Sequence, residues 1–205
     1  PASGVTAVVL NVTATDPTAD SHVIVYPHGQ DRPTTSNLNF TAKQTVPNLV
    51  TVPVVDGKIN FYNNAGSVDL IADISGYYTS DGTGSVFIPT SPTRVLDTRE
   101  NNGHLGPVGP GHAIAIRPDL WEYGMPPVGV KAFVLNVTAT DTTADSYVSV
   151  FGSMGPWPTS SNLNFTAGQT VPNAVVTSNA GGVTLYNHVG QVNLVADAFG
   201  YFTAG

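Results

Sequence analysis

The side chains most often used for acid–base and nucleophilic catalysis are few in this chain, and they do not recur where the sequence repeats. The chain of 205 residues has five histidines, and most of it occurs twice at an offset of about 125 residues. His22 aligns with Tyr147, and His188 aligns with Asn64. A general base needed by both copies would not be replaced in this way, and the sequence has no Gly-x-Ser-x-Gly nucleophile motif. These patterns argue against a histidine-dependent hydrolase.

Carboxylates are the second candidate for chemistry, because glycoside hydrolases use a pair of them. The two glutamates, Glu100 and Glu122, both lie in the middle of the chain, which is not repeated. One aspartate does recur, as Asp73 and Asp197, within an apolar strand pattern. We interpret it as a structural acid held by an arginine or by turn amides, since a buried charge needs a partner, and Arg94 and Arg99 are the candidate arginines. The sequence therefore predicts a protein that is not an enzyme.

Two acidic loops could hold calcium. Asp16 and Asp20 lie four residues apart in a turn, and Asp141 and Asp145 repeat this spacing in the second copy. Such loops offer hard oxygen ligands, which calcium prefers, although the spacing is not that of an EF-hand. The alternative is that these aspartates cap turns by binding local backbone amides.

Aromatic residues give the most useful functional signal. By the alternation of the expected strands, several of them point away from the core, and others lie in loops. Sugars pack their C–H faces on aromatic rings, so these positions predict a carbohydrate-binding surface; the alternative is that the rings cover gaps between sheets or between the two halves. The candidate ligand-binding residues are Trp121, Tyr123, Trp157, Tyr26, Tyr62 and Tyr186.

The positions of these residues follow from an internal repeat. Residues 36–48 recur as residues 161–173 with one substitution, Lys43 to Gly168. We expect a first unit over residues 1–79, lacking its opening strands, and a second, complete unit over residues 84–205. We favour a fragment of a longer tandem array, and the alternative is that the middle segment serves both halves of one body.

Period-two alternation indicates that both units are built of strands. Val8, Leu10, Val12 and Ala14 share one face of residues 5–15, and similar runs are separated by Gly, Pro, Asn and Asp turns. Residues 86–99 are expected to form two strands broken by proline. The pattern predicts an all-β fold of two tandem antiparallel β-sandwich units, the first truncated at its N-terminus.

Composition limits the partners. The net charge is −7, and the seven basic residues form no cluster, so we expect no nucleic-acid partner. The chain has no cysteine, and no apolar run approaches the about 20 residues that span a bilayer, so no membrane insertion is expected.

Four motifs together resemble repeat modules of secreted actinobacterial proteins. They are Arg94-Val-Leu-Asp-Thr-Arg99, Val134-Leu-Asn-Val-Thr-Ala-Thr140, Ser161-Asn-Leu-Asn-Phe165 and Val195-Ala-Asp-Ala-Phe-Gly-Tyr201. The resemblance covers the whole second unit and the first from residue 4. It implies an extracellular, non-catalytic module, cell-surface or lectin-like, that often stands beside secreted hydrolases. The expected function is binding of a glycan or cell-wall polymer, and the alternative is a structural or protein-docking repeat that binds a partner chain.

Overall fold

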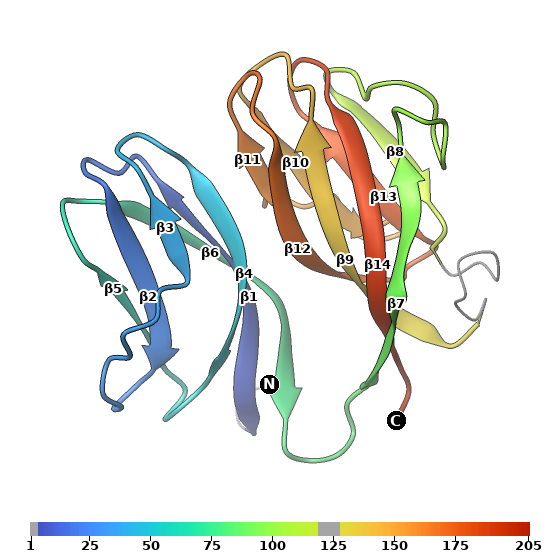
Figure 1. Cartoon of the computed structure of the whole chain (residues 1–205). Helices are drawn as coiled ribbons and strands as arrows, with labels where there is room; N and C mark the ends of the chain where they lie inside the picture. The colour runs from blue at the N-terminus through green and yellow to red at the C-terminus, as the bar shows by residue number, and fades with distance from the viewer. Residues whose placement is uncertain (1–3, 119–127) are drawn as a thin grey trace. The chain divides into compact units, whose positions relative to one another are not determined.

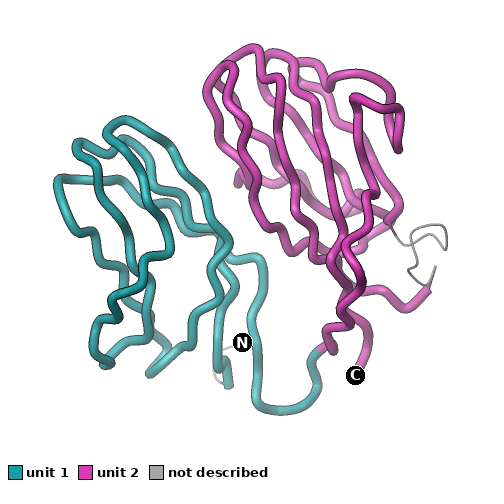
Figure 2. The backbone as a smooth tube through the Cα atoms, viewed as in Figure 1, with its two compact units in different colours: residues 1–84 teal, residues 85–205 magenta. Residues whose placement is uncertain are grey.

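A computed structural model describes residues 4–118 and 128–205 of the chain. Its described residues form strands, turns and loops without a helix, so the all-β prediction is confirmed. The chain divides into two compact units, residues 1–84 and residues 85–205, coloured separately in Figure 2. Each unit consists of two antiparallel sheets that enclose one hydrophobic core, as expected of a β-sandwich.

The first unit, called unit 1 below, has two sheets of three strands each (Figure 1). One sheet has the order β4-β1-β6, formed by Val46–Pro53, Val5–Thr15 and Asp69–Thr79. The other has the order β3-β2-β5, formed by Leu38–Phe40, Ser21–Pro27 and Ile59–Asn63. Leu10, Val12 and Ala14 of β1 are buried between the sheets, as the alternation predicted.

The second unit, called unit 2, has two sheets of four strands each. The first has the order β12-β9-β14-β7, formed by Val171–Ser178, Val130–Thr140, Asn193–Thr203 and Val86–Asp97. The second has the order β11-β10-β13-β8, formed by Leu163–Phe165, Ser146–Gly152, Val183–Asn187 and His112–Ile116. Strands β9 to β14 thus correspond in order and pairing to β1 to β6, while β7 and β8 have no counterpart in the described part of unit 1.

Strand β7 differs from the prediction. Residues 86–99 were expected to hold two strands, but they form one continuous strand, Val86–Asp97. Pro89 and Pro92 are tolerated because β7 is an edge strand that pairs only with β14, so a missing N–H need not break a ladder. The pairing shifts register between Ala198 and Gly200, which accommodates the irregular segment.

Candidate functional site

An aromatic surface lies on the outer side of the β10 and β13 strands. Ser149 of β10 pairs with Tyr186 of β13, and both side chains lie on the side opposite to the buried Val148 and Leu185. Phe151 follows two residues after Ser149, so it lies on the same side. Strand periodicity therefore places Tyr186 and Phe151 next to each other on the outer face.

The loop after β10 adds Trp157 to this face. The centroid of the Trp157 ring lies 5.2 Å from that of Phe151 and 5.1 Å from that of Tyr186, at interplanar angles of 58° and 74°. Tyr147 stacks on His188 with centroids 4.7 Å apart, and it lies 6.4 Å from Tyr186. We call these five residues the aromatic platform.

Hydrogen bonds hold the Trp157 loop against the sheet. Ser149 donates its hydroxyl to the Ser160 carbonyl at 2.6 Å, and Thr184 donates its hydroxyl to Ser153 Oγ at 2.9 Å. The amide of Met154 donates to the Ala180 carbonyl at 2.7 Å. The loop is thus fixed at both ends, while Trp157 itself is 60% exposed. The Trp157 indole is therefore exposed to solvent on a loop that is anchored to the sheet.

Unit 1 carries a reduced form of this surface. Tyr26 and Tyr62 occupy the positions of Phe151 and Tyr186, and both are half-buried. Arg32 takes the position of Trp157, and its guanidinium carbon lies 3.8 Å from the centre of the Tyr62 ring. Since a cation replaces the exposed indole, the two units present different surfaces at equivalent places.

The structure thus brings together only some of the predicted ligand-binding residues. Trp157 and Tyr186 meet in unit 2, and Tyr26 and Tyr62 lie on neighbouring strands in unit 1. Trp121 and Tyr123 lie outside the described residues. The predicted site residues did not include Tyr147, Phe151 and His188. Alternation had placed Phe151 on the outer face, but the contacts of these rings with residues of other strands left no signal in the sequence.

The acidic loops bind backbone amides. Asp20 Oδ1 accepts a hydrogen bond from the Ala42 amide at 2.8 Å, and Asp145 Oδ1 accepts one from the Ala167 amide at 2.9 Å. Asp16 and Asp141 adopt left-handed backbone conformations, with φ of 50° and 51°. No group of three or more acidic or histidine side chains that could share a metal ion occurs in the described parts of the chain. The calcium sites remain a prediction.

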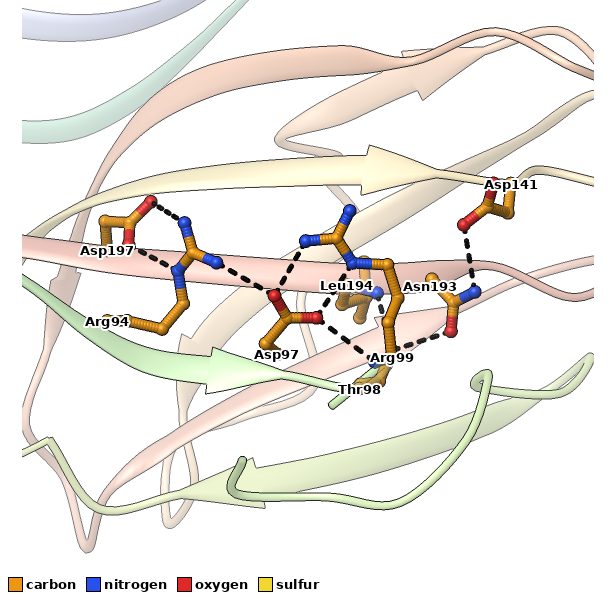
Figure 3. Close-up of polar contacts among 8 residues, drawn as sticks. All are labelled: Arg94, Asp97, Thr98, Arg99, Asp141, Asn193, Leu194 and Asp197. Atoms are coloured by element: carbon orange, nitrogen blue, oxygen red, sulfur yellow. Dashed lines mark hydrogen bonds and ion pairs between the residues drawn. The ribbon is translucent and has the colours of Figure 1, made fainter. Parts of the chain in front are cut away.

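A network of arginines and aspartates joins β7 to β14 (Figure 3). Arg94 Nε lies 2.6 Å from Asp197 Oδ1, and Arg94 Nη1 lies 2.8 Å from Asp97 Oδ2. Arg99 contacts Asp97 through Nε at 2.9 Å and Nη2 at 2.7 Å. Asp97 is fully buried, and the hydrogen bond from Arg99 is the main cause that lowers its pKa to about 2. Of the two arginines named as candidate partners of Asp197, Arg94 is the one that contacts it.

The equivalent aspartate of unit 1 has a different environment. Within the described residues no lysine or arginine lies within ion-pair distance of Asp73. Burial without a compensating cation raises the pKa of the Asp73 carboxyl. Among the described residues, the predicted arginine partner exists for Asp197 and not for Asp73, because residues 4–84 of unit 1 form no strand equivalent to β7.

The histidines and Glu100 do not form a catalytic arrangement with one another in the described contacts. His28 Nδ1 lies 3.2 Å from Asn60 Oδ1, and His112 Nδ1 lies 2.9 Å from the Pro110 carbonyl oxygen. His188 stacks in the aromatic platform. Glu122 lies outside the described residues.

The sequence matches no protein-family model, and comparisons with curated proteins and with solved structures also find no match. No described segment is a helix of sufficient length and apolarity to cross a membrane. The class that the fold defines is an all-β, sandwich-like protein of two units.

Proposed function

We propose that this chain is a secreted, non-catalytic, lectin-like module that binds a polysaccharide of a cell wall or cell surface through the aromatic platform. The observation that carries the proposal is that the exposed Trp157 ring lies against both Phe151 and Tyr186, with centroid distances of 5.2 Å and 5.1 Å. The extracellular location is part of the proposal and follows from the resemblance described for the sequence.

Sugar chemistry suits this surface. The C–H faces of a pyranose ring are apolar and pack on aromatic rings, while its hydroxyls need hydrogen-bond partners at the rim. The Tyr186 hydroxyl and His188 Nδ1, which lie 3.3 Å apart, supply polar atoms at the edge of the platform. The net charge of −7 favours a neutral or basic polymer over an acidic one.

A sedimentation assay tests the proposal. The protein is incubated with cellulose, chitin, peptidoglycan and whole bacterial cells, with and without calcium. We expect saturable retention on one material, lost in the Trp157→Ala/Tyr186→Ala double variant and retained in Tyr62→Ala, the matched change in unit 1. Equal retention of the unmodified protein, the double variant and Tyr62→Ala would refute binding by the aromatic platform. Loss only when calcium is removed would assign binding to the Asp16 and Asp141 loops instead.

A structural or protein-docking repeat is the second candidate, and a separate observation favours it. Apolar side chains of β6 in unit 1 are exposed at positions that are buried in unit 2. Exposed apolar strand edges commonly mark protein contacts. An extended particle in solution scattering with no affinity for any polysaccharide would favour this candidate over carbohydrate binding.

A further inference from the structure

Unit 1 leaves open the two sheet edges that β7 and β8 cover in unit 2. In unit 2, β7 pairs with β14 and β8 pairs with β13. The equivalent strands of unit 1, β6 and β5, end their sheets without such a neighbour. Each sheet of unit 1 is therefore one strand short at the same side, and its backbone donors and acceptors there are available for pairing.

The side chains along this side are apolar and exposed. Ile74 is 71% exposed, whereas Ala198 at the equivalent position is fully buried. Phe61 is 39% exposed, whereas the equivalent Leu185 is fully buried beside Ile114 of β8. These exposed fractions differ because the covering strands are missing, and not because the residues of unit 1 are more polar. Unit 1 therefore retains an apolar face that a partner could cover.

The core of unit 1 opens at this side. A cavity of about 660 Å³ is lined by Val8, Leu10, Ile59 and Ile74 among others. In unit 2 the four equivalent residues are all fully buried; they are Phe133, Leu135, Val183 and Ala198. Ile116 of β8 pairs with Val183, next to this region. Strands of the β7 and β8 type would close the corresponding opening in unit 1.

The carboxylate of Asp73 and the empty space beside Gly76 restrict which kind of strand the open edge can accept. Asp73 occupies the position of Asp197 but lacks the arginine that Arg94 provides there. At Gly200 a Cβ atom would lie only 2.5 Å from the Ile88 carbonyl oxygen of β7, whereas nothing lies within 4 Å of the same place at Gly76. Unit 1 therefore keeps both an acceptor for an arginine and a glycine where a strand would approach closely.

We infer that the open side of unit 1 accepts, by β-strand addition, a two-stranded polypeptide segment of the type formed by residues 86–116, supplied by a further polypeptide. In the register of unit 2, Arg94 faces Asp197 and Ile88 faces Tyr201. The donor would thus place an arginine opposite Asp73 and an aliphatic residue opposite Tyr77.

A second copy of this chain does not meet the requirement. The Arg-Val-Leu-Asp-Thr-Arg pattern occurs once in 205 residues, at residues 94–99. Each chain therefore offers two acceptor units and one donor segment, and that donor already pairs with unit 2. Exchange of donors between copies would leave one unit open in every chain, so the occupant must come from outside residues 1–205. This inference does not depend on carbohydrate binding.

The test measures binding of a fluorescent peptide with the sequence of residues 85–117 to the full chain by anisotropy. We expect saturable binding with one peptide per chain, and hydrogen exchange slowed in β6 and β5 but not in β4. Replacing the peptide arginine that corresponds to Arg94 by alanine and the change Asp73→Asn should each weaken binding about tenfold, and together no more than either alone. Gly76→Val should abolish binding, while Thr51→Val on the opposite edge strand should have no effect.

A second measurement tests the same pairing in case the free peptide binds too weakly to be detected. In a chain with a copy of residues 85–128 placed directly before Gly4, the spacing of unit 2 is reproduced and the donor acts intramolecularly. We expect slower hydrogen exchange in β6 of this chain, reversed by Gly76→Val. Unchanged exchange in β6 in both experiments would overturn the inference, as would self-association of the unmodified chain that Gly76→Val removes.

Discussion

Arg94 forms a two-pronged contact with Asp197, with Nε 2.6 Å from Oδ1 and Nη2 3.3 Å from Oδ2. The contact ties edge strand β7 to β14, and the same guanidinium reaches the buried Asp97. The hydrogen bond to Asp197 is the main cause that raises the pKa of Arg94. Because Asp73 occupies the equivalent place and has no arginine partner among the described residues, we expect the two units to differ in stability, in pH response and in what their edges can bind.

Asp97→Asn should destabilise unit 2. The buried carboxylate accepts hydrogen bonds from two arginines, and an amide cannot accept them all, so we expect a loss of about 2 kcal/mol in the free energy of unfolding. Hydrogen exchange in β14 and β9 measures it, because exchange reports each unit separately. The matched change Asp73→Asn should cost little. An equal effect of both substitutions would contradict the role assigned to the arginines.

The two units should respond oppositely to acid. The pKa of Asp97 is lowered to about 2, so its stabilising effect is complete above its ordinary pKa near 3.8 and is lost as the pH falls from about 4 to 2. Burial raises the pKa of Asp73 above 3.8, so its protonation as the pH falls toward 3.8 favours the folded form of unit 1, and this gain is complete below that pH. Hydrogen exchange measured between pH 5 and pH 2 should show the stability of unit 2 falling with pH. Asp97→Asn should remove most of this pH dependence.

Val8 and Phe133 are equivalent residues of the two units, and giving each position the residue of the other should change the stability of its unit in opposite directions. Phe133 is fully buried, so Phe133→Val leaves a void and should destabilise unit 2 by about 2 to 4 kcal/mol. Val8 lines the open cavity of unit 1, so Val8→Phe should stabilise that unit by about 1 kcal/mol. Chemical denaturation of both variants compares them. Destabilisation by Val8→Phe would mean that the cavity cannot take the larger ring.

Alanine should be tolerated at Gly76 and not at Gly200. A methyl group at Gly200 would meet the Ile88 carbonyl oxygen and the Phe87 ring, at 2.5 Å and 2.7 Å, so β7 must shift, at a cost of about 1 to 3 kcal/mol. At Gly76 the space is empty, and alanine should be neutral or stabilising by about 0.5 kcal/mol. Thermal unfolding of both variants tests this. Equal losses at the two positions would show that β7 is not the cause.

Arg32→Trp should create a second platform in unit 1. The guanidinium of Arg32 already lies over the Tyr62 ring, where Trp157 contacts Tyr186 in unit 2. If polysaccharide is bound by the platform, two sites on one chain should raise affinity for an insoluble polymer at least about tenfold through avidity. Depletion isotherms on the retained polymer measure this. Arg32→Ala is the control and should produce no gain, since it removes the cation without adding a ring.

Much of the fold follows from the sequence because β-structure leaves a local signal. The alternation of Val8, Leu10 and Val12 indicates the buried face of β1. Pro47, which cannot donate to a strand ladder, is compatible with the edge position that β4 has in the structure. Residues 86–99 were mispredicted because two prolines normally interrupt a strand, and only the edge position of β7 makes a continuous strand acceptable.

The sequence predicted only some of the residues of the candidate site. Outward alternation pointed to Tyr186, and composition pointed to Trp157, but neither indicated that Trp157 folds back onto β10 and β13. That contact depends on the path of the loop after β10, which is held to the strands by hydrogen bonds from Ser149 to Ser160 and from Thr184 to Ser153. Periodicity reports the side of a strand on which a residue lies and carries no information on its neighbours from other strands.

The sequence by itself determined the strand content, the repeat and the buried faces, because each depends on residues close together along the chain. Only the tertiary structure decided that Arg94 contacts Asp197 and that Asp73 has no such cation, because sheet pairing joins residues about a hundred positions apart. It also decided that Ile74 is exposed while its equivalent Ala198 is buried. Burial depends on which strands lie alongside, and residues 4–84 form no counterpart of β7 or β8.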